Sequence, residues 1–74
     1  MAPLRDIRLG RALSQRDLAE KAGVAPKTIV DLEFGRNEPR LRTIRLIAQA
    51  LGVAVTEIDE FRVTVAELEE KVAA

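Results

Sequence analysis

Residues 14–36 read SQRDLAEKAGVAPKTIVDLEFGR and predict two short helices joined by a tight turn. The hydroxyl of Ser14 can cap the free amide groups of a helix that begins at Gln15, and Asp17 favours the dipole at the same helix end. Gly23 supplies the positive φ that a helix C-terminus usually needs. The first of the two helices is therefore expected to end there.

The second helix of this stretch is expected over residues 26–34. Pro26 suits the first turn of a helix, where its missing amide hydrogen is no loss. Ile29 and Leu32 then mark one buried face, and Gly35 marks the end.

The remaining sequence predicts three more helices. Residues 4–12 form the first, with Leu4, Ile7 and Leu9 as candidates for its inward face. An apolar stripe at helical spacing covers residues 41–51. Thr56 is a good N-cap for a short fifth helix that runs to residue 61. The expected fold class is all-α, with five helices packed around one core.

The C-terminal segment allows two readings. Phe61, Val65, Leu68 and Val72 recur at helical spacing, whereas the letters FRVTV alternate as in a short strand. We expect a helix-turn-helix domain over residues 1–61 and a C-terminal extension over residues 62–74, which forms an additional helix or a short strand. The four apolar residues are candidate dimer contacts, because a bare stripe must be buried somewhere. The alternative is that they fold back on their own domain.

Composition bounds the function. The 74 residues make one domain and contain neither cysteine nor histidine, which excludes disulfides, thiolate metal sites and histidine acid–base chemistry. We therefore expect no enzyme, no metal and no cofactor. No apolar run approaches the length of a membrane span, and we expect a cytoplasmic protein. Through residue 55 there are ten Lys and Arg against six Asp and Glu, a net of +4, and the remainder carries two against six, a net of −4. A basic segment through residue 55 followed by an acidic one fits a domain that contacts phosphate on one side. The alternative is that these charges only lie on solvated helix faces.

Several short motifs occur together in order. They are Leu13-Ser14-Gln15, residues 18–24 (LAEKAGV), Thr28-Ile29, Leu32-Glu33, Gly35-Arg36, Asn37-Glu38-Pro39 and residues 48–53 (AQALGV). In this order and spacing the chain resembles the phage repressor and Cro-like helix-turn-helix family, of the xenobiotic-response-element type, from about residue 4 to residue 61. The resemblance implies a lambda-repressor-like fold of five helices and double-stranded DNA as the partner.

The resemblance also implies roles for single residues. Residues in the positions of base readers are Lys27, Thr28 and Asp31, on the exposed face of the second motif helix. Candidate contacts to phosphate or the minor groove are Gln15, Arg36, Asn37, Arg40 and Arg42. Gln15 is also expected to brace the recognition helix. Arg8 and Glu33 match a family ion pair, expected to be partly buried, that joins the first helix to the recognition helix.

The chain departs from the family pattern in the recognition helix. Ala25 replaces the usual Ser or Thr cap, and Pro26 cannot hydrogen-bond a base. Phe34 puts a large apolar ring where the family usually has a polar or basic side chain. That ring is expected to fold back on its own surface, to lie on a dimer seam, to contact a thymine methyl group or to meet a protein partner.

The sequence therefore predicts a sequence-specific DNA-binding regulator of transcription, a repressor that acts as a homodimer. The rival hypothesis is an antitoxin. It would repress its own operon through the same domain and bind a toxin through its C-terminal segment or the surface around Phe34.

Overall fold

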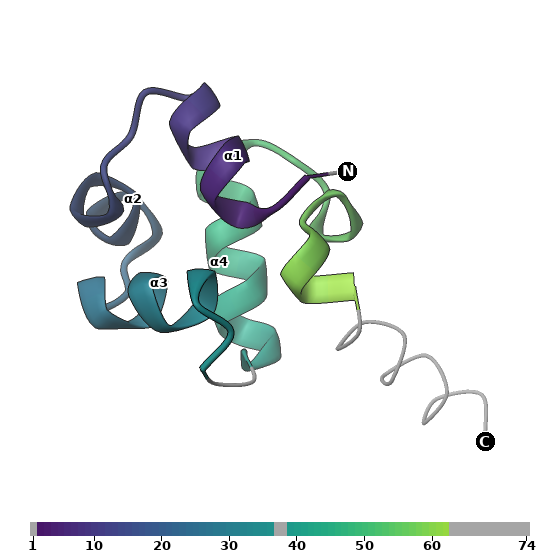
Figure 1. Cartoon of the computed structure of the whole chain (residues 1–74). Helices are drawn as coiled ribbons and strands as arrows, with labels where there is room; N and C mark the ends of the chain where they lie inside the picture. Colours follow the sequence, from purple (N-terminus) through teal and green to yellow (C-terminus); the bar gives the residue numbers. More distant parts are fainter. Residues whose placement is uncertain (1, 37–38, 63–74) are drawn as a thin grey trace, which may run out of the picture.

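The structure, a computed structural model, describes residues 2–36 and 39–62. It contains four α-helices, α1 (Leu4–Gly10), α2 (Gln15–Ala22), α3 (Pro26–Glu33) and α4 (Leu41–Leu51), followed by a 3-10 turn, η1 (Val55–Glu57) (Figure 1). Residues 59–62 are helical again. The described ranges hold no strand, only an isolated bridge between Ala2 and Ile58. The prediction of an all-α fold is confirmed.

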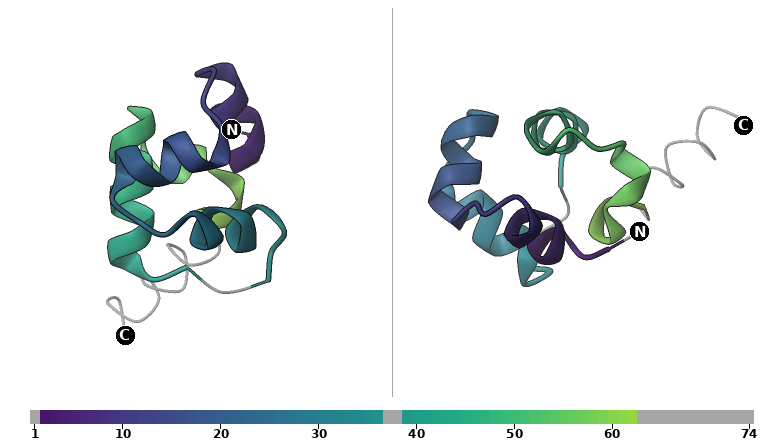
Figure 2. Two further views of the ribbon diagram at one scale, coloured as in Figure 1. Left: turned by 90° about the vertical axis from the view of Figure 1, so that its left-hand side faces the viewer. Right: turned by 90° about the horizontal axis from the view of Figure 1, so that it is seen from above.

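The helices surround one core. Helices α1 and α4 lie between the α2–α3 pair on one side and the η1 turn on the other (Figures 1 and 2). Helix α2 packs against both α3 and α4. Apolar side chains from all these elements meet in the middle, and the largest fully buried ones are Leu4, Leu18, Ile29, Ile44, Ile47, Ile58 and Phe61. The candidate recognition helix, α3, packs mainly against α2 and also against α1.

The start of α2 agrees with the sequence analysis. The N–H of Asp17 donates to Ser14 Oγ at 2.9 Å, and the N–H of Ser14 donates to Asp17 Oδ2 at 3.1 Å. These two bonds form a capping box, which satisfies donors that a helix start leaves free. The Ser14 backbone N–H, followed by the Ser14 hydroxyl, lowers the pKa of the Asp17 carboxyl below its ordinary value of 3.8.

All four α-helices end in the same backbone arrangement, a Schellman motif. One residue adopts a left-handed conformation, and the N–H of the next residue donates to the carbonyl five positions back. The donor and acceptor residues are Leu13 and Arg8, Val24 and Ala19, Arg36 and Asp31, and Val53 and Ala48. In three motifs the left-handed residue is a glycine, and in the motif that ends α1 it is Ala12, with φ 57°.

Two helix predictions differ from the structure. The first helix ends at Gly10 instead of residue 12, because the left-handed turn at Ala12 reverses the chain. Leu9 lies near that end and is 52% exposed, so it does not face inward. The fifth helix does not begin at Thr56. Residues 55–57 form η1 instead, and the Glu57 carboxylate accepts a 2.8 Å bond from the N–H of Ala54.

The chain doubles back at η1 because it pairs with the N-terminal residues. The N–H of Ala2 donates to the Glu57 carbonyl at 3.1 Å, and the N–H of Asp59 donates to the Ala2 carbonyl at 3.0 Å. Glu60 Oε1 then accepts a 2.8 Å bond from the N–H of Leu4, the first residue of α1. Pro3 cannot cap α1 with its side chain, and Glu60 does so from 56 positions away. We call this set of bonds the terminal clasp.

Phe61 belongs to the core. Its side chain is fully buried against the domain, with 0% exposed, so the prediction that it is a dimer contact is wrong. The cause is the terminal clasp, which turns residues 58–61 inward. Val65, Leu68 and Val72 lie outside the described residues, as does the extension after residue 62.

Candidate nucleic-acid interface

Helix α3 presents its N-terminal end to solvent. Pro26 and Lys27 are exposed and Thr28 is half-buried. Ala25 precedes the helix and makes no side-chain cap, so this end carries no protein side chain over its amide groups. Two of the three expected base readers, Lys27 and Thr28, therefore lie side by side at an accessible helix start.

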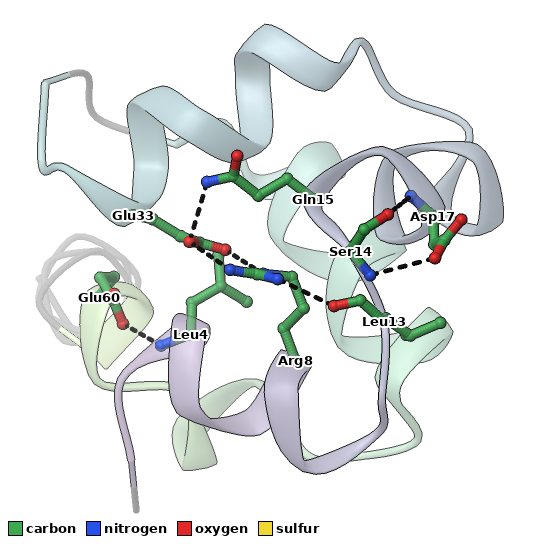
Figure 3. Close-up of polar contacts among 8 residues, drawn as sticks. All are labelled: Leu4, Arg8, Leu13, Ser14, Gln15, Asp17, Glu33 and Glu60. Atoms are coloured by element: carbon green, nitrogen blue, oxygen red, sulfur yellow. Dashed lines mark hydrogen bonds and ion pairs between the residues drawn. The ribbon is translucent and has the colours of Figure 1, made fainter.

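A buried polar network holds α3 to the two preceding helices (Figure 3). Arg8 of α1 donates from Nε to Glu33 Oε2 at 2.7 Å and from Nη2 to Glu33 Oε1 at 3.1 Å. The two side chains are only 8% and 5% exposed. The third guanidinium nitrogen, Nη1, donates to the Leu13 carbonyl at 2.9 Å in the turn between α1 and α2. The structure thus contains the ion pair that the sequence analysis expected.

Gln15 joins the same network from the start of α2. Its Nε2 donates to Glu33 Oε1 at 3.2 Å, so one carboxylate is bound from both preceding helices (Figure 3). Bidentate Arg–carboxylate bonds fix geometry as well as contributing energy. The position of α3 relative to α1 and α2 is therefore set by directional bonds in addition to apolar packing. The contact that Gln15 makes with phosphate stays a prediction.

The network lines one wall of a surface hollow of about 430 Å³. Arg5, on the exposed side of α1, and Phe34, at the end of α3, complete the lining together with Arg8, Gln15 and Glu33. The charge of Arg8 is balanced by Glu33, so Arg5 leaves the hollow with a net positive charge. The sequence analysis missed Arg5. Only the folded structure, in which Arg5 and Gln15 line the same hollow, distinguishes it from other exposed arginines.

Asp31 differs from its expected placement. The sequence analysis counted it among the exposed residues of the recognition helix, but the residue is only 8% exposed. The motif that ends α3 brings the chain back to this residue, because the Arg36 N–H donates to the Asp31 carbonyl at 2.9 Å. There Arg36 Nη1 approaches Asp31 Oδ1 at 3.8 Å. The expectation that Asp31 is exposed is wrong, and its predicted contact with a base would need this pair to separate.

Phe34 and Arg36 form a second contact at the same helix end. Phe34 is 68% exposed, so the ring does not fold back into the domain. The guanidinium carbon of Arg36 lies 5.1 Å from the centre of the ring, within range of a cation–π contact. Nothing in a helical pattern predicts this pair, because the glycine between the two residues reverses the chain.

The remaining candidate phosphate contacts lie around the start of α4. Arg40 is the N-cap residue of α4 and makes no side-chain bond to the helix, and both Arg40 and Arg42 are exposed. A cation at a helix N-terminus is unfavourable unless an anion is close. Asn37 lies outside the described residues.

Two other features are absent from residues 2–36 and 39–62. There, no group of three or more acidic, histidine or cysteine side chains is placed to hold a metal ion. Within the same ranges no helix has the length and apolar character needed to cross a membrane.

Comparison with known proteins adds to this geometry. Residues 4–58 match the model of a family described as helix-turn-helix. The chain is 34% identical over 55 residues to the transcriptional repressor RstR of the cryptic phage CTXphi from Vibrio cholerae, and 40% identical over 55 residues to the immunity repressor of Bacillus phage phi105. It is 45% identical over 49 residues to an HTH-type transcriptional regulator of Methanothermobacter thermautotrophicus.

These relatives differ in how much of their length is matched. The alignments cover 74% of this chain for each phage repressor but only 50% and 38% of the repressors themselves. The archaeal regulator is matched over 66% of this chain and 71% of its own length. No solved structure matches the chain. The residues that match the family model, 4–58, span α1 to α4 and η1, so they include the three helices that carry the polar network, α1, α2 and α3.

Proposed function

Because the chain belongs to the helix-turn-helix family, we propose that it regulates transcription by binding double-stranded DNA at specific sequences. The observation that carries the proposal is the buried network of Arg8, Gln15 and Glu33. It fixes one short helix, α3, with its uncapped N-terminal end exposed. A helix that is to read base edges must be held in a defined orientation, since its contacts depend on hydrogen-bond geometry.

In this proposal α3 enters the major groove with its N-terminal end first. Lys27 donates to the O6 and N7 acceptors of guanine, and the methyl group of Thr28 contacts thymine. Pro26 contributes shape only. With so few donors, base readout is confined to a short segment of each half-site.

Backbone contacts surround this segment. Gln15 binds a phosphate at the start of α2, where helix amide groups point outward. Arg36, Arg40, Arg42 and Asn37 supply further contacts to phosphate or the minor groove. These contacts set the register of the protein on DNA and provide most of the salt-dependent affinity.

The proposed regulator is a repressor that acts as a homodimer. The repressor names of the two phage relatives support the first point. For the second, Val65, Leu68 and Val72 remain the candidate dimer contacts, without Phe61. Two copies of α3 about one helical turn apart would occupy adjacent major grooves and exclude polymerase from a promoter by steric overlap.

The test is selection of a random duplex library on the purified protein at near-physiological salt. A pseudo-palindrome with half-site centres about 10 base pairs apart is expected. Lys27→Gln then relaxes the preference at one base pair of each half-site. Lys21→Gln is the matched control, because Lys21 is also exposed but lies in the last turn of α2. A library that shows no enrichment would refute sequence-specific binding.

An antitoxin is the second candidate function. The observation in its favour is the exposed ring of Phe34, which offers an apolar contact for a protein partner. A small basic toxin encoded in the neighbouring reading frame, and co-purification of its product with this chain, would support the antitoxin. Failure of that product to bind the wild-type protein would exclude it.

A further inference from the structure

The end of α3 differs chemically from two helix ends that share its backbone. In each Schellman motif the residue after the left-handed position lies against the residue five positions back, and this contact is usually apolar. The pairs are Val24 with Ala19 at the end of α2, Val53 with Ala48 at the end of α4, and Arg36 with Asp31 at the end of α3. Helix α3 therefore carries an ion pair at the position where α2 and α4 each carry two apolar residues and where α1 carries Leu13 and Arg8.

Three interactions hold Arg36. Its N–H donates to the Asp31 carbonyl at 2.9 Å, which fixes the backbone. Its guanidinium lies 3.8 Å from the Asp31 carboxylate and stacks on the ring of Phe34, with 5.1 Å from Cζ to the ring centre. Even so, the Arg36 side chain remains 63% exposed, whereas that of Asp31 is 11% exposed. The arginine is thus oriented by its neighbours and still open to a ligand.

Stability does not explain this arrangement well. Exposed ion pairs and exposed cation–π contacts contribute little to folding, and a valine would bury more apolar surface at this position. The helix dipole favours a cation at a helix C-terminus but does not require an aromatic ring beside it. An exposed aromatic side chain that stacks on a guanidinium restricts the rotamers of that arginine. Such restriction matters when the arginine has to meet a ligand.

We propose that Asp31 and Phe34 are positioning residues, which hold the Arg36 guanidinium for a phosphate of the DNA backbone, and that Asp31 reads no base. This inference rests on the proposed DNA binding. A guanidinium has five N–H donors in one plane, so it can face Asp31 with one nitrogen, stack on Phe34 with its face and bind a phosphate oxygen with the donors left over. Asp31, the acidic residue of the recognition helix, then supports a contact to the DNA backbone instead of contacting a base.

The test is a double-mutant cycle on DNA affinity. Phe34→Leu removes the ring without a change of charge and weakens binding about 2- to 5-fold, the range for an exposed cation–π contact. Phe34→Tyr keeps the ring and binds as the wild type does. In an Arg36→Gln background Phe34→Leu has no effect, because the arginine through which it acts is absent. Arg36→Gln itself lowers the salt dependence, the slope of log K against log salt, by about 0.9 for each copy of the chain that is bound.

Two results would overturn the role of Phe34. One is a Phe34→Leu variant that binds as tightly as the wild type. The other is a loss of the same size in both backgrounds, which would mean that the ring contacts DNA itself or acts on the fold. Circular dichroism melting curves of each variant check folding, and an exposed position such as Phe34 tolerates leucine.

Asp31 is tested by base preference in the library selection. Asp31→Asn is expected to enrich the same sequence as the wild type, because a residue that holds Arg36 affects all duplexes alike. A changed preference at one base pair would show that Asp31 reads a base and would refute this part of the inference.

Failure of the inference can be told apart from failure of the proposed function. Phosphate contacts do not depend on sequence, so the cycle is measured on the enriched duplex or, without enrichment, on a random one. No enrichment together with a coupled Phe34–Arg36 pair would refute sequence specificity alone. Enrichment with an uncoupled pair would refute the positioning role alone. If the wild-type protein binds no duplex, both are refuted.

Discussion

Ala12→Gly should make the domain more stable, although it removes a methyl group. Ala12 ends α1 in the left-handed conformation, with φ 57°, at the position that glycine occupies in the corresponding turns after α2, α3 and α4. Its N–H and that of Leu13 donate back to the carbonyls of Leu9 and Arg8 at 2.9 and 3.2 Å, so the turn cannot relax without losing these bonds. The side chain itself is exposed and contributes little burial.

The expected gain follows from two opposing terms. Left-handed backbone costs an L-residue about 1–2 kcal/mol. Glycine loses more conformational freedom on folding than alanine does, at a cost of about 0.5–1 kcal/mol. The difference leaves a stabilisation of about 0.5–1 kcal/mol. For a domain of this size each kcal/mol raises Tm by about 4–8 °C.

The assay is urea unfolding followed by far-ultraviolet circular dichroism at one fixed protein concentration. Gly52→Ala is the matched control, because it places alanine in the same turn at the end of α4. A Cβ atom there would meet nothing within 4 Å, so its expected loss of about 0.5–1 kcal/mol is a backbone effect alone. The reasoning is refuted if Gly52→Ala destabilises the domain as expected but Ala12→Gly leaves the unfolding midpoint unchanged or lowers it.

Three further outcomes are expected from stability measurements. Glu33→Gln should lower the free energy of unfolding in urea by about 3–5 kcal/mol, because it leaves the buried guanidinium of its arginine partner without a counter-charge. Glu20→Gln, in an exposed pair, should change that free energy by less than about 1 kcal/mol. Equal effects of the two substitutions would contradict the role of burial. The backbone N–H of Ser14, followed by its hydroxyl, lowers the pKa of Asp17, so the stability that ionised Asp17 contributes is present above pH 3.8 and is lost as the pH falls through the lower pKa of the folded state. Ser14→Ala should therefore flatten the dependence of Tm on pH below 3.8. An unchanged dependence in that range would count against the capping box. Phe61→Ala should cost about 3–5 kcal/mol, as for a core aromatic residue, and a loss that disappears on dilution would instead favour a dimer contact.

Local chemistry was enough to predict most helix bounds. The Ser14–Asp17 box and the glycine at position 23 each act through residues within five positions, so the sequence shows them directly. The same kind of reasoning failed for α1, because its last turn uses an alanine in a conformation that alanine rarely adopts. The start of η1 was missed for another reason. It depends on pairing between Ala2 and Ile58, which are far apart in the sequence.

In the candidate site, too, local interactions could be predicted from the sequence and contacts between distant residues could not. Arg8 and Glu33 could be paired from the sequence only through a resemblance, since 25 positions separate them. A helical pattern places Asp31 on the exposed face of α3, but it takes no account of the chain that returns after the helix. Likewise, the spacing of Phe61 and the apolar residues after it identifies a stripe, yet spacing does not tell what the stripe packs against.

The terminal clasp makes the domain nearly a closed ring. Backbone hydrogen bonds join residue 2 to residues 57 and 59, so a short linker between the two ends of the described domain, residues 2 and 62, would close it at little cost in loop entropy. New ends could then be opened in the turn between α1 and α2, and this circular permutant would keep the order of α2, α3 and α4. The N-terminal side of the clasp also lies away from α2 and α3 (Figure 1), so a reporter fused there leaves the recognition surface uncovered. Deletion of the first three residues, in contrast, would open the ring, because it removes both backbone bonds that Ala2 makes with Glu57 and Asp59.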